Sequence, residues 1–571
     1  MTTNNSVLNS AGLNVQEPKT VKQALKLPHW VDAMKEELEA LHNNNTWTLV
    51  PSPSPQTNIV GSKWVFKTKL HSDGSIDRFK ARLVARGYSQ VPGLDFDETF
   101  SPVLKPTTLR LVIALATTLS WPLRQLDVKN AFLHGKLKEE VYISQPPGFE
   151  DPIHPNYVCK LNKSIYSLKQ APRAWFDTFT IQLFQIGFYC SRAYSSLFIL
   201  HRDQDIALLL LYVNDIVLIA NSLQLLQEII SNLSSKFALK DLGSLNYFLG
   251  IEVNKFPGGI FLSQAKYAKD ILCRASMLEA SAIATPMAIK DATSLRDNEL
   301  VNAQEYRKLV GALQYLTITR LDICHAVNKV CQFMQQPTLT HLRQVKRILR
   351  YIKGTMHHGL RFSSHSTLSL TGFCDADWAG CLSTRRSTTG YCVFLGANCI
   401  SWSSKKQPTV ARSTAEAEYR AFASTTAEVT WITYLLRDIG MSLPNPPQIF
   451  SDNISALHMS INPVFHARTK HIELDYHFVR EKVALGTLVT RYIPSRDQVA
   501  DPLTKPLPHA QFQVLKFKLG LVGSPTSSLR GSMKKQSIQE PNKETNNSKY
   551  EQSRSELNKE TAAKEEGNYL S

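Results

Sequence analysis

Hydrophobic residues recur along most of the chain with the periods of helices and strands. Between Leu27 and His42 the apolar residues fall on one face at helical spacing, which predicts an amphipathic helix. Between Ile206 and Ala220 two apolar runs flank Asn214 and Asp215, a polar pair typical of the turn between two buried strands. The alternation of helix and strand patterns predicts a multidomain chain of the α/β and α+β classes.

A second α/β pattern fills residues 367–510, after a mostly helical stretch at 300–360. Beyond about Gly523 the hydrophobic pattern ends, and Ser, Asn, Lys and Glu dominate. A segment of this composition cannot bury enough apolar surface to offset the entropy of ordering it. We therefore predict a disordered tail.

The composition adds a charge imbalance to this pattern. The chain has 571 residues, of which 65 are Lys or Arg and 48 are Asp or Glu, so its net charge is +17. Its hydrophobic content of 43% excludes a chain that is disordered throughout. A positive charge of this size favours a polyanionic partner, above all nucleic acid.

Several classes of protein are excluded by what the sequence lacks. The first ten residues have neither the basic nor the apolar region of a secretory signal. The longest apolar run, Ile206–Ala220, is too short and too polar at its centre to cross a bilayer. The nine cysteines include no C-x-x-C pair, which argues against a disulfide scaffold and a zinc knuckle. We expect an intracellular protein of the cytoplasm or nucleus, with no contact to membranes.

Two windows of the sequence are strongly basic. In residues 61–90, Lys80 and Arg82 lie two apart, so they share one face of a predicted strand and could grip phosphates. An ordinary solvated basic sheet face is the alternative. Residues 341–361 contain no acid, whereas a solvated helix usually mixes charges of both signs. We therefore favour a helix that binds a nucleic-acid backbone through Arg343, Arg347 and Arg350.

Two separate segments bring acidic residues into strand-like runs. Asp127 follows one apolar run, and Asp215 lies at the tip of the predicted hairpin. By itself the hairpin is better explained as an ordinary buried hairpin with a polar tip. Together with other motifs, these segments resemble the reverse transcriptase of copia-type LTR retrotransposons. The motifs are KWVFK (63–67), RFKARLVARG (78–87), DETFSPV (97–103), QLDVKNAFL (125–133), QPPGF (145–149), LKQAPRAW (168–175) and YFLGI (247–251).

The resemblance runs from about residue 25 to 520 and implies a right-hand polymerase. Its palm would hold two Mg²⁺ ions, with Mn²⁺ as a possible substitute, through Asp127 and the hairpin carboxylates. Phe132 would stack on the sugar of the incoming dNTP, near Lys80 and Arg82. Further residues that would bind the RNA template and DNA primer are Lys63, Arg78, Gln170, Arg173, Arg343, Arg347 and Arg350.

The hairpin tip departs from the family pattern, which is Tyr-Val-Asp-Asp. Here Asn214 replaces the first Asp, so this catalytic position lacks one negative charge and presents an NH₂ group that repels a cation. Metal assistance contributes several kcal/mol, and about 1.4 kcal/mol is a factor of ten in rate. We therefore predict a polymerase activity reduced by orders of magnitude. Ser167, Tyr194 and Leu321 also depart from the family and indicate a degenerate copy.

A second set of acids lies in the later α/β region. Asp375 falls in an alternating strand pattern, Asp452 ends another strand, and Asp501 begins a short helix. Ser413 and Glu416 form a capping box that starts a long helix, and Gly440 predicts its end.

Within that helix, Glu416 is engaged by the cap, whereas Glu418 lies at the edge of the buried face and can look into a cleft. Surface charge and helix caps are the alternative explanation of such acids. Their order resembles the ribonuclease H fold in its copia-type form, which implies two-metal hydrolysis of the RNA strand of an RNA–DNA hybrid. The four metal ligands would be Asp375, Glu418, Asp452 and Asp501. We do not favour a metal site at His466, His471 and His477, because this ligand set is complete without them.

The resemblance implies five regions. They are a flexible N-terminus (1–24), polymerase fingers, palm and thumb-like part (25–290), a mainly helical connection (291–366), an RNase H-like domain (367–520) and a disordered tail (521–571). No zinc-knuckle spacing, aspartic-protease motif or integrase His/Cys arrangement is present, so we expect only the reverse transcriptase–RNase H end of a Pol polyprotein.

Two functions remain open at this point. The first is a degenerate polymerase with intact RNase H acids, and the second is a catalytically inactive remnant that binds RNA–DNA hybrids. An unexpressed reading frame is a third reading that the sequence does not separate from these.

Overall fold

The computed structural model describes residues 17–71, 75–289, 299–462 and 472–525, together with the backbone of 7–8 and 14–15. Most of the predicted flexible N-terminus and almost all of the predicted tail lie outside these residues, as do His466 and His471. Residues 7–8 (β1) and 14–15 (β2) pair as antiparallel strands. The described helices and strands support the predicted mixed α/β class.

The predicted fingers region begins with the predicted amphipathic helix, which is confirmed as α2 (Pro28–Asn43). Trp30, Met34 and Leu41 of α2 are buried, as the helical spacing predicts. Helix α1 (Val21–Ala24) precedes it, and Ala24 is buried in the same core, so ordered structure begins before residue 25. The strands are β3 (Trp47–Val50), β4 (Ile59–Val60), β5 (Ser62–Leu70), β6 (Ile76–Ala85), β8 (Tyr142–Ile143) and β9 (Val158–Leu161).

The hairpin β5–β6 is antiparallel and pairs Ser62 with Ala85 at its open end. The predicted turn between these strands, residues 72–74, lies outside the described residues. A four-stranded sheet of order β3-β9-β8-β4 completes the region.

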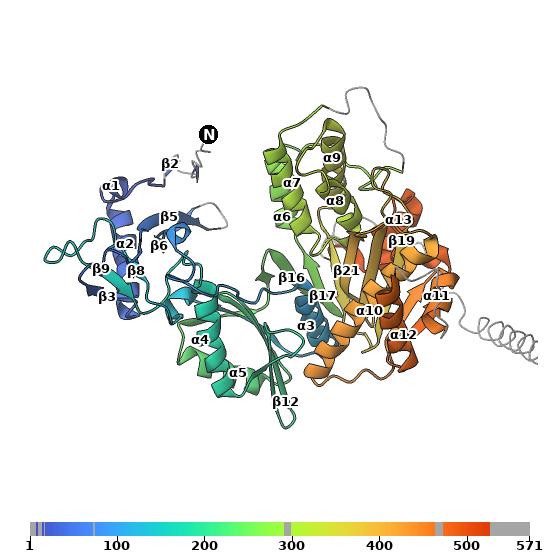
Figure 1. The fold of residues 1–571 in the computed structure, drawn as a ribbon, viewed down its shortest axis with the longest axis horizontal. Coiled ribbons are helices and arrows are strands. Elements are labelled where there is room, and N and C mark those ends of the chain that lie inside the picture. The colour runs from blue at the N-terminus through green and yellow to red at the C-terminus, as the bar shows by residue number, and fades with distance from the viewer. Residues whose placement is uncertain are drawn as a thin grey trace, which may run out of the picture. The chain divides into compact units, whose positions relative to one another are not determined.

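A six-stranded sheet carries the predicted buried hairpin, and its order is β10-β11-β12-β13-β7-β14. Helices α4 (Ala171–Ile186) and α5 (Leu223–Ser234) lie side by side against it (Figure 1). The strands are β7 (Leu123–Val128), β10 (Tyr189–Cys190), β11 (Leu197–Arg202), β12 (Asp205–Tyr212), β13 (Asp215–Ala220) and β14 (Leu239–Ser244).

Both faces of this sheet are buried, which explains the unbroken apolar run of the sequence. Leu209 and Leu211 of β12 pack into a core with α4 and α5. Leu208 and Leu210, which point to the opposite face, pack into a second core with α3 (Pro106–Thr118). A strand buried on both faces needs apolar residues at every position, so the usual alternation is lost.

A five-stranded antiparallel sheet of order β15-β16-β17-β18-β24 follows along the chain. Its last strand, β24, extends the fold beyond the boundary at 521 where the tail was predicted to begin, and Leu521 is buried. The strands are β15 (Tyr247–Phe248), β16 (Ile251–Phe256), β17 (Gly259–Ser263), β18 (His358–Ser363) and β24 (Leu521–Gly523).

The predicted connection is mainly helical, and its helices share one hydrophobic core. Figure 1 shows α6, α7, α8 and α9 next to one another. Helix α13, which the sequence assigned to the RNase H-like domain, contributes Phe512 and Leu515 to this core instead. The helices are α6 (Ala265–Arg274), α7 (Ala303–Leu316), α8 (Cys324–Cys331), α9 (Leu339–Gly354) and α13 (His509–Lys518).

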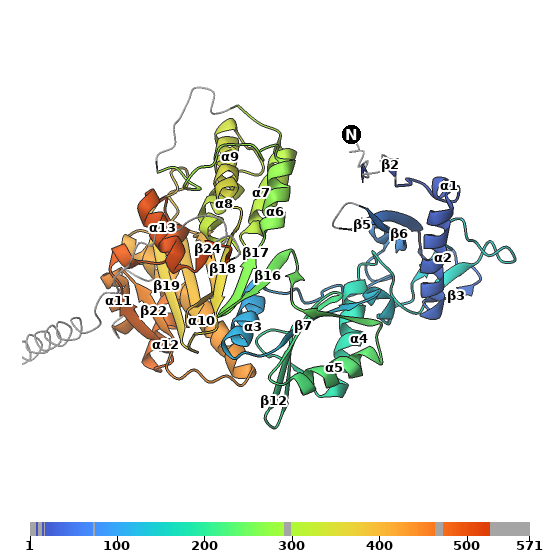
Figure 2. The ribbon, with the colours of Figure 1, turned by 180° about the vertical axis from the view of Figure 1, so that it is seen from behind.

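The last sheet has the order β21-β20-β19-β22-β23, in which β22 runs parallel to both β19 and β23. The long helix α10 (Thr414–Asp438) packs against β19, α11 (Ile454–Ile461) contacts β22, and α12 (Glu473–Ala484) packs against α10 and α11 (Figure 2). This is the strand order of an RNase H-like fold. The strands are β19 (Leu370–Asp377), β20 (Thr388–Leu395), β21 (Asn398–Lys406), β22 (Gln448–Ser451) and β23 (Val489–Tyr492).

The predicted boundaries of α10 are confirmed. Ser413 caps the helix by accepting a hydrogen bond from the Glu416 backbone N–H, and the Glu416 carboxylate accepts one in return from the backbone N–H of Arg412. Gly440 follows the helix with a φ of +81°, a conformation that glycine adopts without strain. Within the described residues, no helix is both long and apolar enough to cross a membrane.

Candidate active sites

The palm hairpin places Asp215 directly opposite Asp127 on the neighbouring strand β7. The turn of this hairpin consists of Val213 and Asn214, so Asp215 is the first residue of β13 and not a turn residue. Val213 has a φ of +53°, which is strained for a β-branched residue. The Trp175 indole N–H donates a hydrogen bond of 2.6 Å to the Val213 carbonyl and holds the turn in place.

Asn214 turns its side chain toward the palm carboxylates. Its Nδ2 donates a hydrogen bond of 2.6 Å to Oδ1 of Asp127, an assignment that follows the hydrogen-bond network. Burial raises the pKa of Asp215, and the nearby Asp127 raises it further. The Asn214 amide therefore places donor hydrogens beside the oxygen to which a palm cation would bind.

The predicted nucleotide-binding residues come together on the fingers side of the palm. Phe132, in the short 3-10 helix η2 (Ala131–His134), makes an edge-to-face contact with Tyr166, with ring centroids 5.5 Å apart. The guanidinium of Arg82 lies 4.7 Å from the centre of the same Tyr166 ring. Lys80 is partly buried, and burial followed by the charges of Arg82 and Arg78 lowers its pKa. These residues form a basic, aromatic-lined surface that suits a phosphate-bearing ligand.

The hairpin β5–β6 carries a basic face that the sequence only partly indicates. Lys67 pairs directly across the strands with Lys80, and Lys69 pairs with Arg78. Like charges at directly opposed positions are destabilising in a sheet. A polyanion bound on this face would relieve that repulsion. The exposed Lys63 lies further along the same side of β5.

A buried carboxyl beneath this hairpin was missed by the sequence reasoning. Glu37 of α2 is 6% exposed, although it is charged in water. Burial raises the pKa of Glu37 to about 7, while the backbone N–H of Leu83 and the cations Lys80 and Arg82 oppose this rise. Glu37 thus couples α2 electrostatically to the residues predicted to bind the nucleotide.

The residues predicted to hold the template make hydrogen bonds and an ion pair with other residues of the protein. Gln170 is buried; its Nε2 donates to the Asp95 carbonyl over 2.8 Å and its Oε1 accepts from Gln90 over 3.0 Å. Arg173 lies 2.7 Å from a carboxylate oxygen of Glu98. Gln170 therefore shapes the loop at Asp95, and only Arg173 of the two remains at the surface.

The basic helix α9 divides its arginines between two environments. Arg343 is exposed. Arg347 donates a hydrogen bond of 2.9 Å to the Thr285 hydroxyl, and Arg350 donates one of 2.8 Å to the Ser281 carbonyl. Both arginines are therefore bonded to the segment that precedes the predicted helical connection. The structure thus places only part of the predicted basic stripe where a nucleic acid could reach it.

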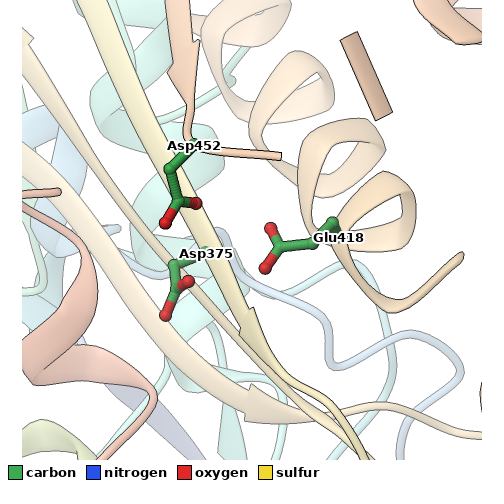
Figure 3. Close-up of side chains that lie close together, drawn as sticks. All are labelled: Asp375, Glu418 and Asp452. Atoms are coloured by element: carbon green, nitrogen blue, oxygen red, sulfur yellow. The ribbon is translucent and has the colours of Figure 1, made fainter. Parts of the chain in front are cut away.

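The RNase H-like site gathers acids from three elements (Figure 3). Asp375 comes from β19, Glu418 from the first turns of α10, and Asp452 follows β22. One ligand oxygen of each lies within 4.8 Å of the others, and no other set of three acidic, His or Cys side chains in the described ranges meets this condition. The backbone N–H of Ala376 donates 3.2 Å to Oε1 of Glu418.

The fourth predicted acid, Asp501, begins the 3-10 helix η6 (Asp501–Leu503) and lies beside a lysine. Lys505 Nζ is 2.9 Å from Oδ1 of Asp501 and 3.5 Å from Oδ2 of Asp375. The Thr504 hydroxyl also donates to Oδ2 of Asp375. Neither Lys505 nor Thr504 was singled out from the sequence.

Burial and, to a smaller extent, mutual repulsion raise the pKa values of acids in this cluster. Burial, followed by the charges of Asp375 and Asp452, raises the pKa of Glu418 to about 9. Burial and the charge of Asp375 raise the pKa of Asp501 to about 7, against the opposing effect of Lys505. Burial also raises the pKa of Asp375. Packed carboxylates of this kind are stabilised by a cation between them.

The residues present fit a divalent metal ion at the RNase H-like site better than in the palm. Oε2 of Glu418 is buried without a hydrogen-bond partner and belongs to an all-oxygen donor set, which hard cations such as Mg²⁺ prefer. The palm offers two carboxylates, Asp127 and Asp215, of which one accepts a hydrogen bond from Asn214. His477 is exposed, and the other two histidines of the disfavoured site lie outside the described residues.

Known proteins match the chain over both the polymerase-like and the RNase H-like regions. Residues 44–289 match the family model "Reverse transcriptase (RNA-dependent DNA polymerase)". The retrovirus-related Pol polyprotein from transposon RE1 of Arabidopsis thaliana is 50% identical over 512 residues, which cover 90% of this chain and 35% of that protein. The corresponding polyprotein from transposon TNT 1-94 of Nicotiana tabacum is 39% identical over 89% of this chain and 39% of its own length.

A shorter relative is covered almost completely. The uncharacterized mitochondrial protein AtMg00810 of Arabidopsis thaliana is 55% identical over 223 residues, which are 39% of this chain and 93% of that protein. The chain spans about a third of the length of the transposon polyproteins. The motif order, the two folds and these identities agree. The chain belongs to the copia-type reverse transcriptase family, which includes the retrovirus-related Pol polyproteins of plant transposons.

Proposed function

We propose that this protein cleaves the RNA strand of RNA–DNA hybrids at the RNase H-like site and has little polymerase activity. The observation that carries the proposal is the convergence of Asp375, Glu418 and Asp452, with a buried Glu418 oxygen that lacks a protein partner. In a purely structural role, Lys505 would offset the charges of Asp375 and Asp501, but the buried Oε2 of Glu418 would stay without a partner. A cation-binding role explains why the acids are gathered.

Each residue of this site has a distinct task in the proposal. Asp375, Glu418 and Asp452 hold the metal, and Asp501 adds a further oxygen beside Asp375. Bound Mg²⁺ supplies an activated water and neutralises charge on the scissile phosphate. The Ala376 backbone N–H fixes one Glu418 oxygen and thereby leaves the other oriented toward the cluster.

The basic face of β5–β6 would bind the phosphate backbone of the template and primer. Cross-strand cationic pairs are formed by Lys67 with Lys80 and by Lys69 with Arg78. Glu17 lies 3.6 Å from Lys67 and Asp77 lies 3.9 Å from Arg78, so the charge of the face is partly offset. Arg82 and Phe132, linked through the Tyr166 ring, would bind the triphosphate and sugar of a dNTP. In this proposal nucleic-acid binding survives although nucleotide transfer is impaired.

The palm supports impaired polymerisation through one contact. Asn214 donates to the Asp127 oxygen that a catalytic metal would need, and it adds no negative charge. Two neighbouring divalent cations need several carboxylates to offset their repulsion, and the palm offers two.

The test is cleavage of an RNA–DNA hybrid with a labelled RNA strand by the purified chain in Mg²⁺ or Mn²⁺. We expect cleavage by the unaltered chain and none by Asp452→Asn. Glu481→Gln, which changes an acid that is 61% exposed, is the matched control and should cleave normally. Equal cleavage by the unaltered chain and Asp452→Asn would contradict the site assignment.

A hybrid-binding protein without catalysis is the second candidate function. The basic face of β5–β6 favours it, because that face needs no metal to bind phosphates. In this case the chain would bind the hybrid at low salt, and neither Mg²⁺ nor Mn²⁺ would lead to cleavage. Binding that persists in Asp452→Asn is expected for both candidates, so cleavage separates them.

A further inference from the structure

Lys505 divides the four acids of the RNase H-like site into two parts. Asp375, Glu418 and Asp452 form the group whose ligand oxygens lie within 4.8 Å of one another, and Asp501 is not a member. The Lys505 ammonium instead links Asp501 to Asp375, at 2.9 Å and 3.5 Å. Among the described residues, no ion pair joins Lys505 to Glu418 or Asp452.

One oxygen on the Lys505 side already has a hydrogen-bond donor from the protein. Oδ2 of Asp375 accepts a hydrogen bond from Thr504 and faces the Lys505 ammonium. On the other side, Oε2 of Glu418 has no hydrogen-bond partner. Buried Oδ1 of Asp501 also has no hydrogen-bond partner, and it is compensated by the Lys505 ammonium 2.9 Å away. The Lys505 side thus has a cation of the protein beside its carboxylates, whereas among the described residues no ion pair joins Glu418 to a cation.

An ammonium and a divalent ion exclude each other at this position. A Mg²⁺ or Mn²⁺ ion shared by Asp375 and Asp501 would lie about 2.0–2.4 Å from their oxygens. Lys505 Nζ lies within hydrogen-bond reach of Oδ1 of Asp501, so ion and ammonium would stand nearly in contact. Repulsion between them would be large in a buried site.

Lys505 can also leave this position. Its side chain is 39% exposed, whereas those of Asp375 and Asp501 are 2% and 4% exposed. A lysine carries its charge on a flexible four-carbon stem, so the ammonium can reach solvent without movement of the backbone. The position can thus hold either the lysine or an ion from solution.

We propose that Lys505 is a tethered cation that fills the second cation position of the RNase H-like site. The inference rests on the proposed function, because it concerns the same metal site. Without nucleic acid, the site then binds a single divalent ion, at Asp375, Glu418 and Asp452. A second ion binds only when Lys505 has moved away.

The test is the number of Mn²⁺ ions bound per chain, measured from the electron paramagnetic resonance signal of free Mn²⁺ without nucleic acid. The full chain carries Asp127→Asn and Asp215→Asn in all samples, so that the palm does not contribute. We expect one ion in this background, two after Lys505→Met, and one after Lys505→Arg, which keeps the positive charge. Adding Asp452→Asn to the background should remove the single ion.

Two results would overturn the inference about Lys505 and leave the proposed function standing. They are a single ion bound after Lys505→Met, or two ions bound in the background, while hybrid cleavage by the unaltered chain is retained. If the background binds no ion and the unaltered chain cleaves no hybrid, the proposed function fails as well. The two failures are therefore distinguishable.

A second measurement covers the case in which Lys505→Met folds poorly without metal, since it leaves Asp375 and Asp501 uncompensated. Mn²⁺ stabilises the folded chain in proportion to the number of ions bound. The unfolding temperature should rise more steeply with Mn²⁺ concentration in Lys505→Met than in the background. An equal dependence in both would contradict the proposal.

Discussion

The palm and the RNase H-like sheet differ in how they offset the repulsion between their clustered carboxylates. Both place carboxylates on adjacent strands, where they repel one another. In the palm, Asn214 relieves the repulsion by donating a hydrogen bond to Asp127, and a negative charge is lost. In the RNase H-like site all four acids remain, and Lys505 supplies a removable positive charge.

The comparison shows that two substitutes for a metal ion have different consequences. An amide is neutral and fixed in the hairpin turn, so it weakens the site for any cation. A lysine is charged and flexible, so it compensates the acids while it leaves them available to a metal. We therefore predict that the palm catalyses little or no polymerisation, whereas the RNase H-like site of the same chain cleaves hybrids.

The largest expected effect comes from removing a central acid of the nuclease. Glu418→Gln should reduce hybrid cleavage by at least about a thousandfold, because the metal loses one of three clustered negative charges and faces an amide in its place. The same change should raise the unfolding temperature in EDTA, since it removes one buried carboxyl from a repelling cluster. Cleavage rates and thermal unfolding measure the two effects. Normal cleavage by the Glu418→Gln variant would show that this cluster is not the active site.

The next effect concerns the palm. Asn214→Asp should increase primer extension on an RNA template by at least about a hundredfold, because it restores the missing negative charge at the hairpin tip. The matched control is Asn232→Asp, which adds the same charge at an exposed position of α5. Gel analysis of the extended primer is the measurement. If both variants extend equally, or the unaltered chain extends efficiently, Asn214 does not limit the polymerase.

A smaller effect concerns the pH dependence of stability. The pKa of Glu37 is raised to about 7, so between its usual range and pH 7 the folded chain keeps a proton that the unfolded chain has released. Stability contributed by this group is therefore present at low pH and is lost as the pH rises toward 7. Glu37→Gln should reduce this loss by about 1–2 kcal/mol, as seen in unfolding midpoints between pH 5 and 7. The control is Glu39→Gln, at an exposed position of the same helix, which should leave the slope unchanged.

The smallest effect concerns hybrid binding by the fingers. Lys69→Gln should lower the affinity for an RNA–DNA hybrid a few-fold and reduce the slope of log affinity against log salt by about one. The slope changes because one fewer phosphate is neutralised. Fluorescence anisotropy at several salt concentrations measures it. An unchanged slope would place the hybrid elsewhere on the protein.

Much of both sites could be predicted from sequence, because their acids lie in strand and helix patterns of known period. The resemblance to copia-type reverse transcriptases implied that Asp127 and Asp215 belong to one site, and the structure places them opposite each other on neighbouring strands. The position of Glu418 follows from a capping box that starts α10. A local signal of this kind can be read from the sequence because it depends only on residues that are close together along the chain.

The features that sequence reasoning missed depend on distant contacts. Glu37 lies at helical spacing between Met34 and Leu41, which could have placed it on the buried face of α2. The spacing of four between Asp501 and Lys505 is a known signal for an ion pair, but its link to Asp375 requires the fold. The pairing of β24 with β18 joins strands more than a hundred residues apart and left no local trace.

One reaction tests the contrast between the two sites most directly. The unaltered chain is mixed with dNTPs, Mg²⁺ and an RNA template annealed to a shorter DNA primer, with a different label on each strand. We expect the RNA to be shortened within the hybrid while the primer keeps its original length. An extended primer, or RNA that stays intact throughout the reaction, would contradict the account.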